Sequence, residues 1–128
     1  MEYTLYLDTH AVVWLYNNEL HKFPQQTLES IDNGNLLISP MVILELEYLY
    51  EIKRLNTNAA IIFNTLQQEL DLQTCPLNFL QVITSVLKQN WTRDPFDRII
   101  VAQAAINQSM LVSKDDIICE NYDKTIWF

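Results

Sequence analysis

Glycine is almost absent from this sequence, which has one glycine in 128 residues, and only 19% of its residues are charged. Apolar residues make up 49%, so residues 1–128 are long and apolar enough to bury a core as a single domain. Extended disorder is not expected from such a composition. Cysteine is scarce as well. Cys75 and Cys119 lack the spacing of a metal site or a disulfide framework, and we expect both to be reduced thiols in the core.

Basic residues are also scarce, since 8 Lys and Arg against 16 Asp and Glu give a formal charge of -8. Duplex binding normally needs a basic face, so a nucleic-acid partner would require positive charge from a metal ion or a second chain. No apolar run approaches the roughly 20 residues of a membrane span. The start, Met1-Glu2-Tyr3, lacks the basic region and cleavage site of a leader peptide. We therefore expect a cytoplasmic protein with no membrane association.

Short apolar segments alternate with helical patterns along the chain. Residues 3–7 predict a buried central strand that runs directly into Asp8, and further strands are predicted at residues 36–38, 72–75, 110–113 and 125–128. Helices are predicted at residues 10–17, 24–33, 40–54, 57–70, 78–90 and 95–106, with a helical turn at 117–121; the predicted caps are Thr9, Ser39, Thr57, Asn78 and Asp94, and Gly34 ends the second helix. This alternation predicts an α/β fold in which helices cover both faces of a parallel sheet of about five strands.

Two of the predicted strands end at an acid. Asp8 follows the central strand and Asp115 follows the strand at residues 110–113, which places both carboxylates at the carboxyl edge of the sheet, where open α/β folds bind ligands. Ser113 lies next to this edge and could donate a hydrogen bond that holds a carboxylate in place.

Two further acids lie on apolar faces of predicted helices. Glu45 is the one acid in a helical stripe, and burying it ionised would cost several kcal/mol without a partner or a metal ion. Asp97 shares helical spacing with apolar residues of its own helix. The neighbours of Glu45 in its stripe are Met41, Tyr48, Leu49 and Ile52, and those of Asp97 are Ile100, Val101 and Ala104.

Each acid also has a structural interpretation. Asp8 could be a turn or capping aspartate, and Asp97 could complete a capping box behind Asp94 and Pro95. We interpret Asp94 as structural. Between the adjacent acids after residue 113, we assign Asp115 to the crevice and Asp116 to the cap of the last helical turn. His10 and His21 have no ligand spacing to one another and are expected at the surface.

Four converging carboxylates would repel one another and raise each other's pKa values unless a cation lay between them. Carboxylate oxygens, with no His or Cys in the set, favour Mg²⁺ or Mn²⁺ over zinc. Such an ion activates water and stabilises charge on a phosphoryl oxygen, as phosphodiester hydrolysis requires. The proposed ligands, which are also the predicted catalytic residues, are Asp8, Glu45, Asp97 and Asp115.

Four ordered blocks of the sequence resemble the PIN-domain family, in particular the VapC-like toxins of type II toxin–antitoxin pairs. The blocks are Leu7-Asp8-Thr9-His10-Ala11, Ser39 to Leu46, Asp94-Pro95-Phe96-Asp97-Arg98 with the apolar run that follows, and Leu111-Val112-Ser113-Lys114-Asp115. The resemblance implies a PIN-like three-layer α/β/α sandwich and a metal-dependent endoribonuclease that hydrolyses RNA. It also implies a cognate antitoxin as partner and frequent formation of a homodimer.

Basic residues near the acids, Arg93, Arg98 or Lys114, would assist binding of the phosphate. Two other functions stay open at this point. A phosphoacceptor receiver-like signalling domain has a similar length and an acid pocket. It would need an Asp at the end of a strand midway along the chain, where residues 45–54 instead have helical spacing and no Asp. A catalytically silent PIN-like interaction module would instead use surface residues such as Tyr16, Ile43 and Tyr50 for partner binding.

Overall fold

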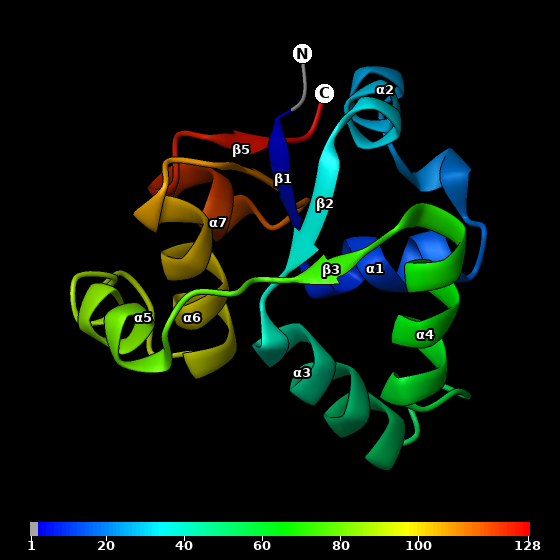
Figure 1. Cartoon of the computed structure of the whole chain (residues 1–128), viewed down its shortest axis with the longest axis horizontal. Helices are drawn as coiled ribbons and strands as arrows, with labels where there is room; N and C mark the ends of the chain where they lie inside the picture. Colours follow the sequence, from blue (N-terminus) through cyan, green and yellow to red (C-terminus); the bar gives the residue numbers. More distant parts are fainter. Residues whose placement is uncertain (1–2) are drawn as a thin grey trace.

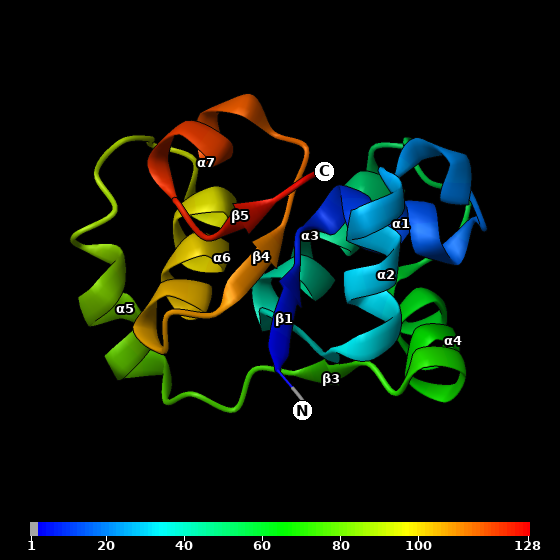
Figure 2. The ribbon, with the colours of Figure 1, turned by 90° about the horizontal axis from the view of Figure 1, so that it is seen from above.

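The computed structural model describes residues 3–128, and within them five strands form one sheet in the order β3-β2-β1-β4-β5 (Figure 1 and Figure 2). The elements are β1 (Thr4–Leu7), α1 (Thr9–Tyr16), the 3₁₀ helix η1 (Leu20–Lys22), α2 (Gln25–Asn33), β2 (Asn35–Ile38), α3 (Pro40–Glu51), α4 (Ala59–Leu70), β3 (Gln73–Thr74), α5 (Phe79–Val86), α6 (Pro95–Ile106), β4 (Met110–Val112), α7 (Asp116–Asn121) and β5 (Thr125–Ile126). The prediction that no leader peptide is present rests partly on Met1 and Glu2, which lie outside the described residues.

Every strand pair in this sheet is parallel. Helices α5, α6 and α7 lie on one side of the strands, and α1, α2 and α4 lie on the other (Figure 2). This division follows from the strand order, because right-handed crossovers toward β3 and crossovers toward β5 place their helices on opposite faces. The predicted three-layer α/β/α sandwich with a parallel sheet of five strands is therefore confirmed.

The central strand is β1, as the sequence predicts. Leu5 and Leu7 are fully buried, and Leu7 is paired in register with Val112 of β4. On the other side, β1 pairs with β2. Because β2 and β4 pair with its two edges and helices cover both of its faces, the carboxyl end of β1 is fixed in position.

Several helix starts differ from the prediction by one residue. Asp8, not Thr9, caps α1, and Asn58, not Thr57, caps α4 by accepting a hydrogen bond from the Ile61 N–H. In both cases the stronger capping side chain of two neighbours is used. The predicted caps Ser39, Asn78 and Asp94 are confirmed.

The face predicted for α3 is also wrong. Its buried residues are Val42 and Leu46, whereas Tyr48 in the predicted stripe is 48% exposed. α3 is apolar on several sides, and its packing against α1, α4 and α6 decides which side is covered. Cysteine placement is half right, because both thiols are free, but only Cys75 is buried and Cys119 is exposed.

Gly34 ends α2 with an extended backbone. A Cβ atom at this position would lie 2.9 Å from the Tyr3 ring and 3.2 Å from the Ser30 carbonyl oxygen. The glycine is therefore needed for close packing between α2 and the start of β1 rather than for a left-handed turn.

Candidate functional site

Asp8 lies where the strand crossovers diverge. From β1 the chain crosses toward β2, and from β4 it crosses toward β5, so a crevice forms beyond the carboxyl ends of these two strands. Asp8 is 6% exposed. Its Oδ1 accepts a hydrogen bond of 2.7 Å from the Thr9 N–H, and its Oδ2 accepts one of 2.7 Å from the Ser113 hydroxyl. The expected role of Ser113 as a hydrogen-bond donor to a carboxylate is thus observed.

Burial raises the pKa of Asp8 even though these hydrogen bonds act in the opposite direction. The nearby charge of Asp115 raises it further, while His10 lowers it. A carboxylate in this position is costly to ionise unless positive charge comes close to it.

Glu45 reaches the same region from α3. Its Oε1 accepts a hydrogen bond from the Thr9 hydroxyl, so Thr9 bridges the two acids: its N–H binds Asp8 and its hydroxyl binds Glu45. Burial raises the pKa of Glu45, and the charges of Asp8 and Asp94 add to that effect. The prediction that Glu45 comes from α3 toward Asp8 agrees with these contacts.

Asp97 lies in the first turn of α6, where the Asp94 side chain caps the helix by accepting from the N–H groups of Phe96 and Asp97. Asp97 is half-buried. Burial raises its pKa to about 7, and the charges of four other acids contribute. These four, in decreasing order of effect, are Asp94, Asp8, Asp115 and Glu45. The other three acids predicted for the site therefore all act electrostatically on Asp97.

Asp115 lies at the crevice beside Asp8, as predicted, but it also caps α7. It is exposed, and its Oδ1 accepts from the N–H groups of both Ile117 and Ile118. The cap had been assigned to Asp116, which is instead the first residue of the helix. The N–H of Asp115 binds the Ser113 hydroxyl, so the capping acid stays linked to Asp8 through Ser113.

A cavity of about 510 Å³ opens beside Asp8. It is lined by Asp8, His10, Trp14, Lys114, Asp115, Asp116 and Ile117. Glu45 and Asp97 do not line it; they approach Asp8 from the α3 and α6 side. The structure thus brings Asp8 and Asp115 into one cavity and places the other two acids within electrostatic range of them.

The chemistry of this donor set fits a hard divalent cation. Within residues 3–128 the one salt bridge joins Lys22 to Glu19, so the acids of the site have no basic partner there. Each carboxylate oxygen that accepts one hydrogen bond keeps a further lone pair. In the described part of the chain, however, no three His, Cys, Asp or Glu side chains form a ready metal-holding group. The residues fit the ion by type and charge, and closing around it requires side-chain rotation.

A comparison with protein families identifies the fold. The family model described as PIN domain matches residues 5–124. This chain belongs to the PIN domain family. The match covers the four blocks on which the resemblance rests, and it includes every acid discussed above.

Two solved structures share this PIN domain fold. One is the crystal structure of VapBC2 from Rickettsia felis bound to a DNA fragment from their promoter, with 16% identity, a TM-score of 0.62 and coverage of 98% of this chain and 99% of that chain. The other is the crystal structure of DNA-bound VapBC from Salmonella typhimurium, with 13% identity, a TM-score of 0.60 and coverage of 96% and 95%. No curated protein matches the sequence. Within residues 3–128, none of the helices combines the length and apolar character needed to cross a membrane.

Among the basic residues expected to assist, Lys114 lines the cavity of this PIN domain. Arg98 points elsewhere, since it donates to the Val86 carbonyl at the end of α5. Sequence reasoning missed the bridging role of Thr9 and the presence of His10 and Trp14 in the cavity wall. Their signal was available: His10 and Trp14 are spaced i, i+4 on the helix that starts directly after Asp8.

Proposed function

We propose that this PIN domain is a VapC-like toxin, a metal-dependent endoribonuclease that hydrolyses RNA phosphodiester bonds. One observation carries the proposal. Asp8, Glu45 and Asp97 come from three separate elements, and each has a raised pKa. Burial is the main cause for all three. Repulsion from neighbouring carboxylates adds to it, from Asp115 in the case of Asp8 and from several acids in the case of Glu45 and Asp97. Ionising these buried and mutually repelling carboxylates costs free energy, and none of them forms a salt bridge within residues 3–128. Such a group of acids suits a site for a divalent cation.

The residues that would hold Mg²⁺ or Mn²⁺ are Asp8, Glu45, Asp97 and Asp115. A divalent ion bound there supplies stabilisation of charge on the phosphoryl oxygens and activation of water for attack. The part of the chain is to position the ligands. Ser113 and the Thr9 N–H fix both oxygens of Asp8, and the Thr9 hydroxyl orients Glu45.

Asp115 has a second task in this proposal. Its Oδ1 is occupied by the cap of α7, which leaves Oδ2 as the oxygen available to the cavity. Because the same residue is linked to Ser113 through its N–H, α7, β4 and Asp8 are coupled in one hydrogen-bond chain. The acid positions therefore depend on one another.

We further propose that a cognate antitoxin neutralises the enzyme and that the chain forms a homodimer. The two fold-similar structures described above are VapBC assemblies, which supports a protein partner for this chain. Exposed apolar side chains offer surfaces for such contacts, among them Leu44, Phe79 and Leu80 at 56%, 73% and 74% exposure.

The test is RNA cleavage by protein purified free of contaminating nuclease. We expect the parent to cut RNA with Mg²⁺ or Mn²⁺ and to stop when EDTA is added. Asp8→Asn and Asp97→Asn should reduce cleavage to background, because each removes a charged ligand with little change of shape. Asp32→Asn, at an exposed position of α2, is the matched control and should cut like the parent.

Two results would contradict the proposal. Equal cleavage by the parent and by Asp8→Asn would mean that the acid cluster is not the site. Metal-independent binding of a partner, with no cleavage of any RNA tested, would favour a silent interaction module instead.

A further inference from the structure

The cavity beside Asp8 has a second wall that is aromatic and basic. Besides Asp8, Asp115, Asp116 and Ile117, the lining contains His10, Trp14 and Lys114. Trp14 and His10 lie one helical turn apart on α1, with ring centroids 6.0 Å apart and an angle of 46° between the rings. An aromatic pair thus starts two residues after the acid that is buried deepest in the site.

The indole of Trp14 is held in place by two other aromatic rings. Phe23 meets it edge-on at 5.8 Å, and Trp127, just after β5, lies 5.7 Å away. Phe23 and Trp127 also contact each other, with centroids 5.3 Å apart. A ring that is fixed before a ligand arrives loses little conformational entropy on binding, so Trp14 is a prepared contact surface.

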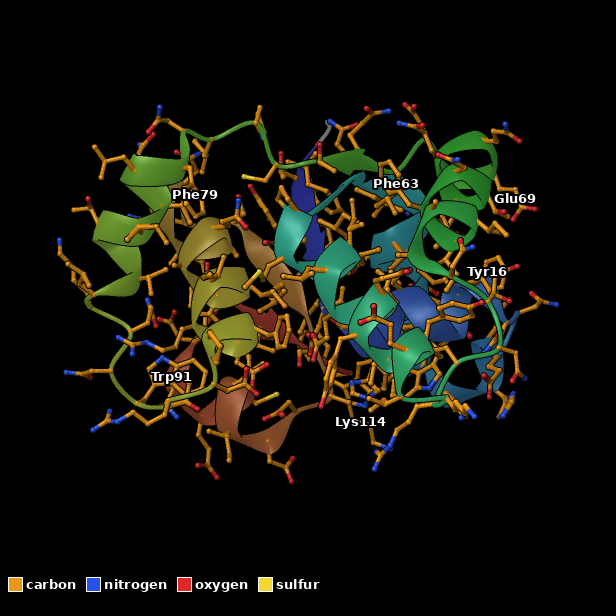
Figure 3. The ribbon with its side chains drawn as sticks, turned by 90° about the horizontal axis from the view of Figure 1, so that it is seen from below. Tyr16, Phe63, Glu69, Phe79, Trp91 and Lys114 are labelled. Carbon is orange, nitrogen blue, oxygen red and sulfur yellow. The ribbon has the colours of Figure 1, made fainter. Side chains whose placement is uncertain are left out.

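Positive charge gathers at the same ring in an otherwise acidic chain. The Nζ atoms of Lys22 and Lys114 lie 5.4 Å and 6.0 Å from the centroid of the Trp14 ring. Lys22 is also paired with Glu19. Lys114 forms no salt bridge within the part of the chain described, although Asp115 and Asp116 follow it directly. Figure 3 shows Lys114 on a side of the molecule away from Phe79, between α7 and the α1 region.

Resting on the proposed ribonuclease function, we propose that His10, Trp14 and Lys114 form a nucleotide subsite of the RNA-binding cleft. A base next to the scissile phosphate stacks on the Trp14–His10 pair, and Lys114 contacts the adjoining backbone phosphate. The Lys114 ammonium is exposed on a flexible stem, so it can leave the indole ring for the phosphate when the base arrives.

The chemistry favours single-stranded RNA as the occupant. A base can stack on an aromatic ring only when it is unpaired and turned out of a helix. Aromatic rings combined with nearby cations are how proteins bind single strands with little sequence preference. In a protein of net charge -8, Lys114 supplies positive charge in the cavity itself, beside the acids that would meet the phosphate.

The experiment measures RNA binding without cleavage. Short single-stranded RNA of mixed sequence is titrated into Asp97→Asn protein in EDTA, and affinity is followed by fluorescence anisotropy. Adding Trp14→Leu should weaken binding about tenfold, within the range that loss of one base stack produces. Adding His10→Asn should weaken it less. Adding Lys114→Gln should lower the slope of log affinity against log salt by about 0.7, the value for one lost phosphate contact on a single strand.

Matched controls separate the subsite from general effects. Lys124→Gln removes an exposed lysine just before β5, at the amino ends of the strands and away from the cavity. His21→Asn removes an exposed histidine of η1. Neither change should alter the RNA affinity. An RNA with abasic residues should bind the Trp14 protein and its Leu variant equally. Because Trp14→Leu could disturb packing against Phe23 and Trp127, its circular dichroism and melting temperature are compared with the parent.

The outcomes distinguish this inference from the function on which it rests. If the parent cuts RNA but His10→Asn, Lys114→Gln and a folded Trp14→Leu all leave RNA affinity unchanged, the subsite is refuted while the ribonuclease stands. If these variants keep RNA affinity and lose only antitoxin binding, the surface belongs to a protein partner and the inference is wrong. If the parent cuts no RNA, the proposed function itself fails.

Discussion

The free energy of unfolding of the metal-free protein should fall as the pH rises, and Asp97→Asn should remove part of that fall. Burial, with the charges of neighbouring acids, raises the pKa of Asp97 from 3.8 to about 7. A raised pKa in the folded state means that the contribution to stability is fully present below pH 3.8 and is lost as the pH rises through about 7. Above that pH the folded protein holds an ionised Asp97 that the unfolded chain would solvate better.

The magnitude follows from the size of the shift. At about 1.4 kcal/mol for each unit of pKa shift, the difference between the unfolded and folded pKa values of Asp97 corresponds to about 4 kcal/mol of stability. Asp97 is half-buried, so solvent screening reduces this to about 2 kcal/mol. Burial also raises the pKa of Asp8 and Glu45, and these acids act in the same direction.

Urea denaturation in EDTA at about pH 5 and about pH 8 measures the effect. The advantage of Asp97→Asn over the parent should grow by about 1–2 kcal/mol between the two conditions. Asp32→Asn, which changes an exposed carboxylate on α2, should show no such growth. If the difference between Asp97→Asn and the parent does not depend on pH, the premise that the site holds unneutralised buried acids is wrong.

Adding Mg²⁺ should reverse the same destabilisation. At a concentration about 100 times its dissociation constant, an ion that binds only the folded state adds about 2.7 kcal/mol. The gain should be larger at about pH 8 than at about pH 5, because the ion and protons compete for the same carboxylates. A gain of equal size in Asp97→Asn would place the ion outside the acid cluster.

Three further predictions test separate parts of the structure. Ser113→Ala should weaken Mn²⁺ binding about 10- to 100-fold by isothermal titration, since it frees the carboxylate that Ser113 holds; unchanged affinity would refute this positioning role. Gly34→Ala should lower the free energy of unfolding by about 1–3 kcal/mol, because the added methyl group meets the Tyr3 ring and a backbone carbonyl; a neutral effect would contradict the packing argument. A thiol reagent should label native protein at exposed Cys119 and spare Cys75 until unfolding, as peptide mapping would show.

The parts of the fold that the sequence predicted correctly are those with local signals. Ser39-Pro40 and Asp94-Pro95 each combine a capping side chain with a proline in the first turn, and the structure starts α3 and α6 there. Asn78 gives a similarly clear start for α5. In each case the physical cause, satisfaction of free N–H groups at a helix start, acts within a few residues and can be read from the chain itself.

The parts that failed depend on contacts made across the molecule. The stripe through Glu45 and Tyr48 has helical spacing, yet the neighbouring stripe of Val42 and Leu46 is the buried one, because α3 packs against α1, α4 and α6. Local sequence also could not decide between two adjacent acids: Asp115 became the cap of α7 because the chain leaves β4 with its N–H bound to the Ser113 hydroxyl. Amphipathic pattern alone cannot choose a face when a helix is apolar on more than one side.

The same distinction applies within the proposed site, which combines one rigid ligand with adjustable ones. Asp8 follows β1, whose last residue is paired in register with Val112, and both of its oxygens already accept hydrogen bonds. Glu45 and Asp97 instead come from α3 and α6, two helices that pack against each other at the end of the sheet. An ion bound at Asp8 can therefore close its coordination by moving side chains of these helices without disturbing the strands. Hydrogen exchange should then show metal-dependent protection at the start of α6 and none in β1, and the reverse pattern would contradict a site anchored on Asp8.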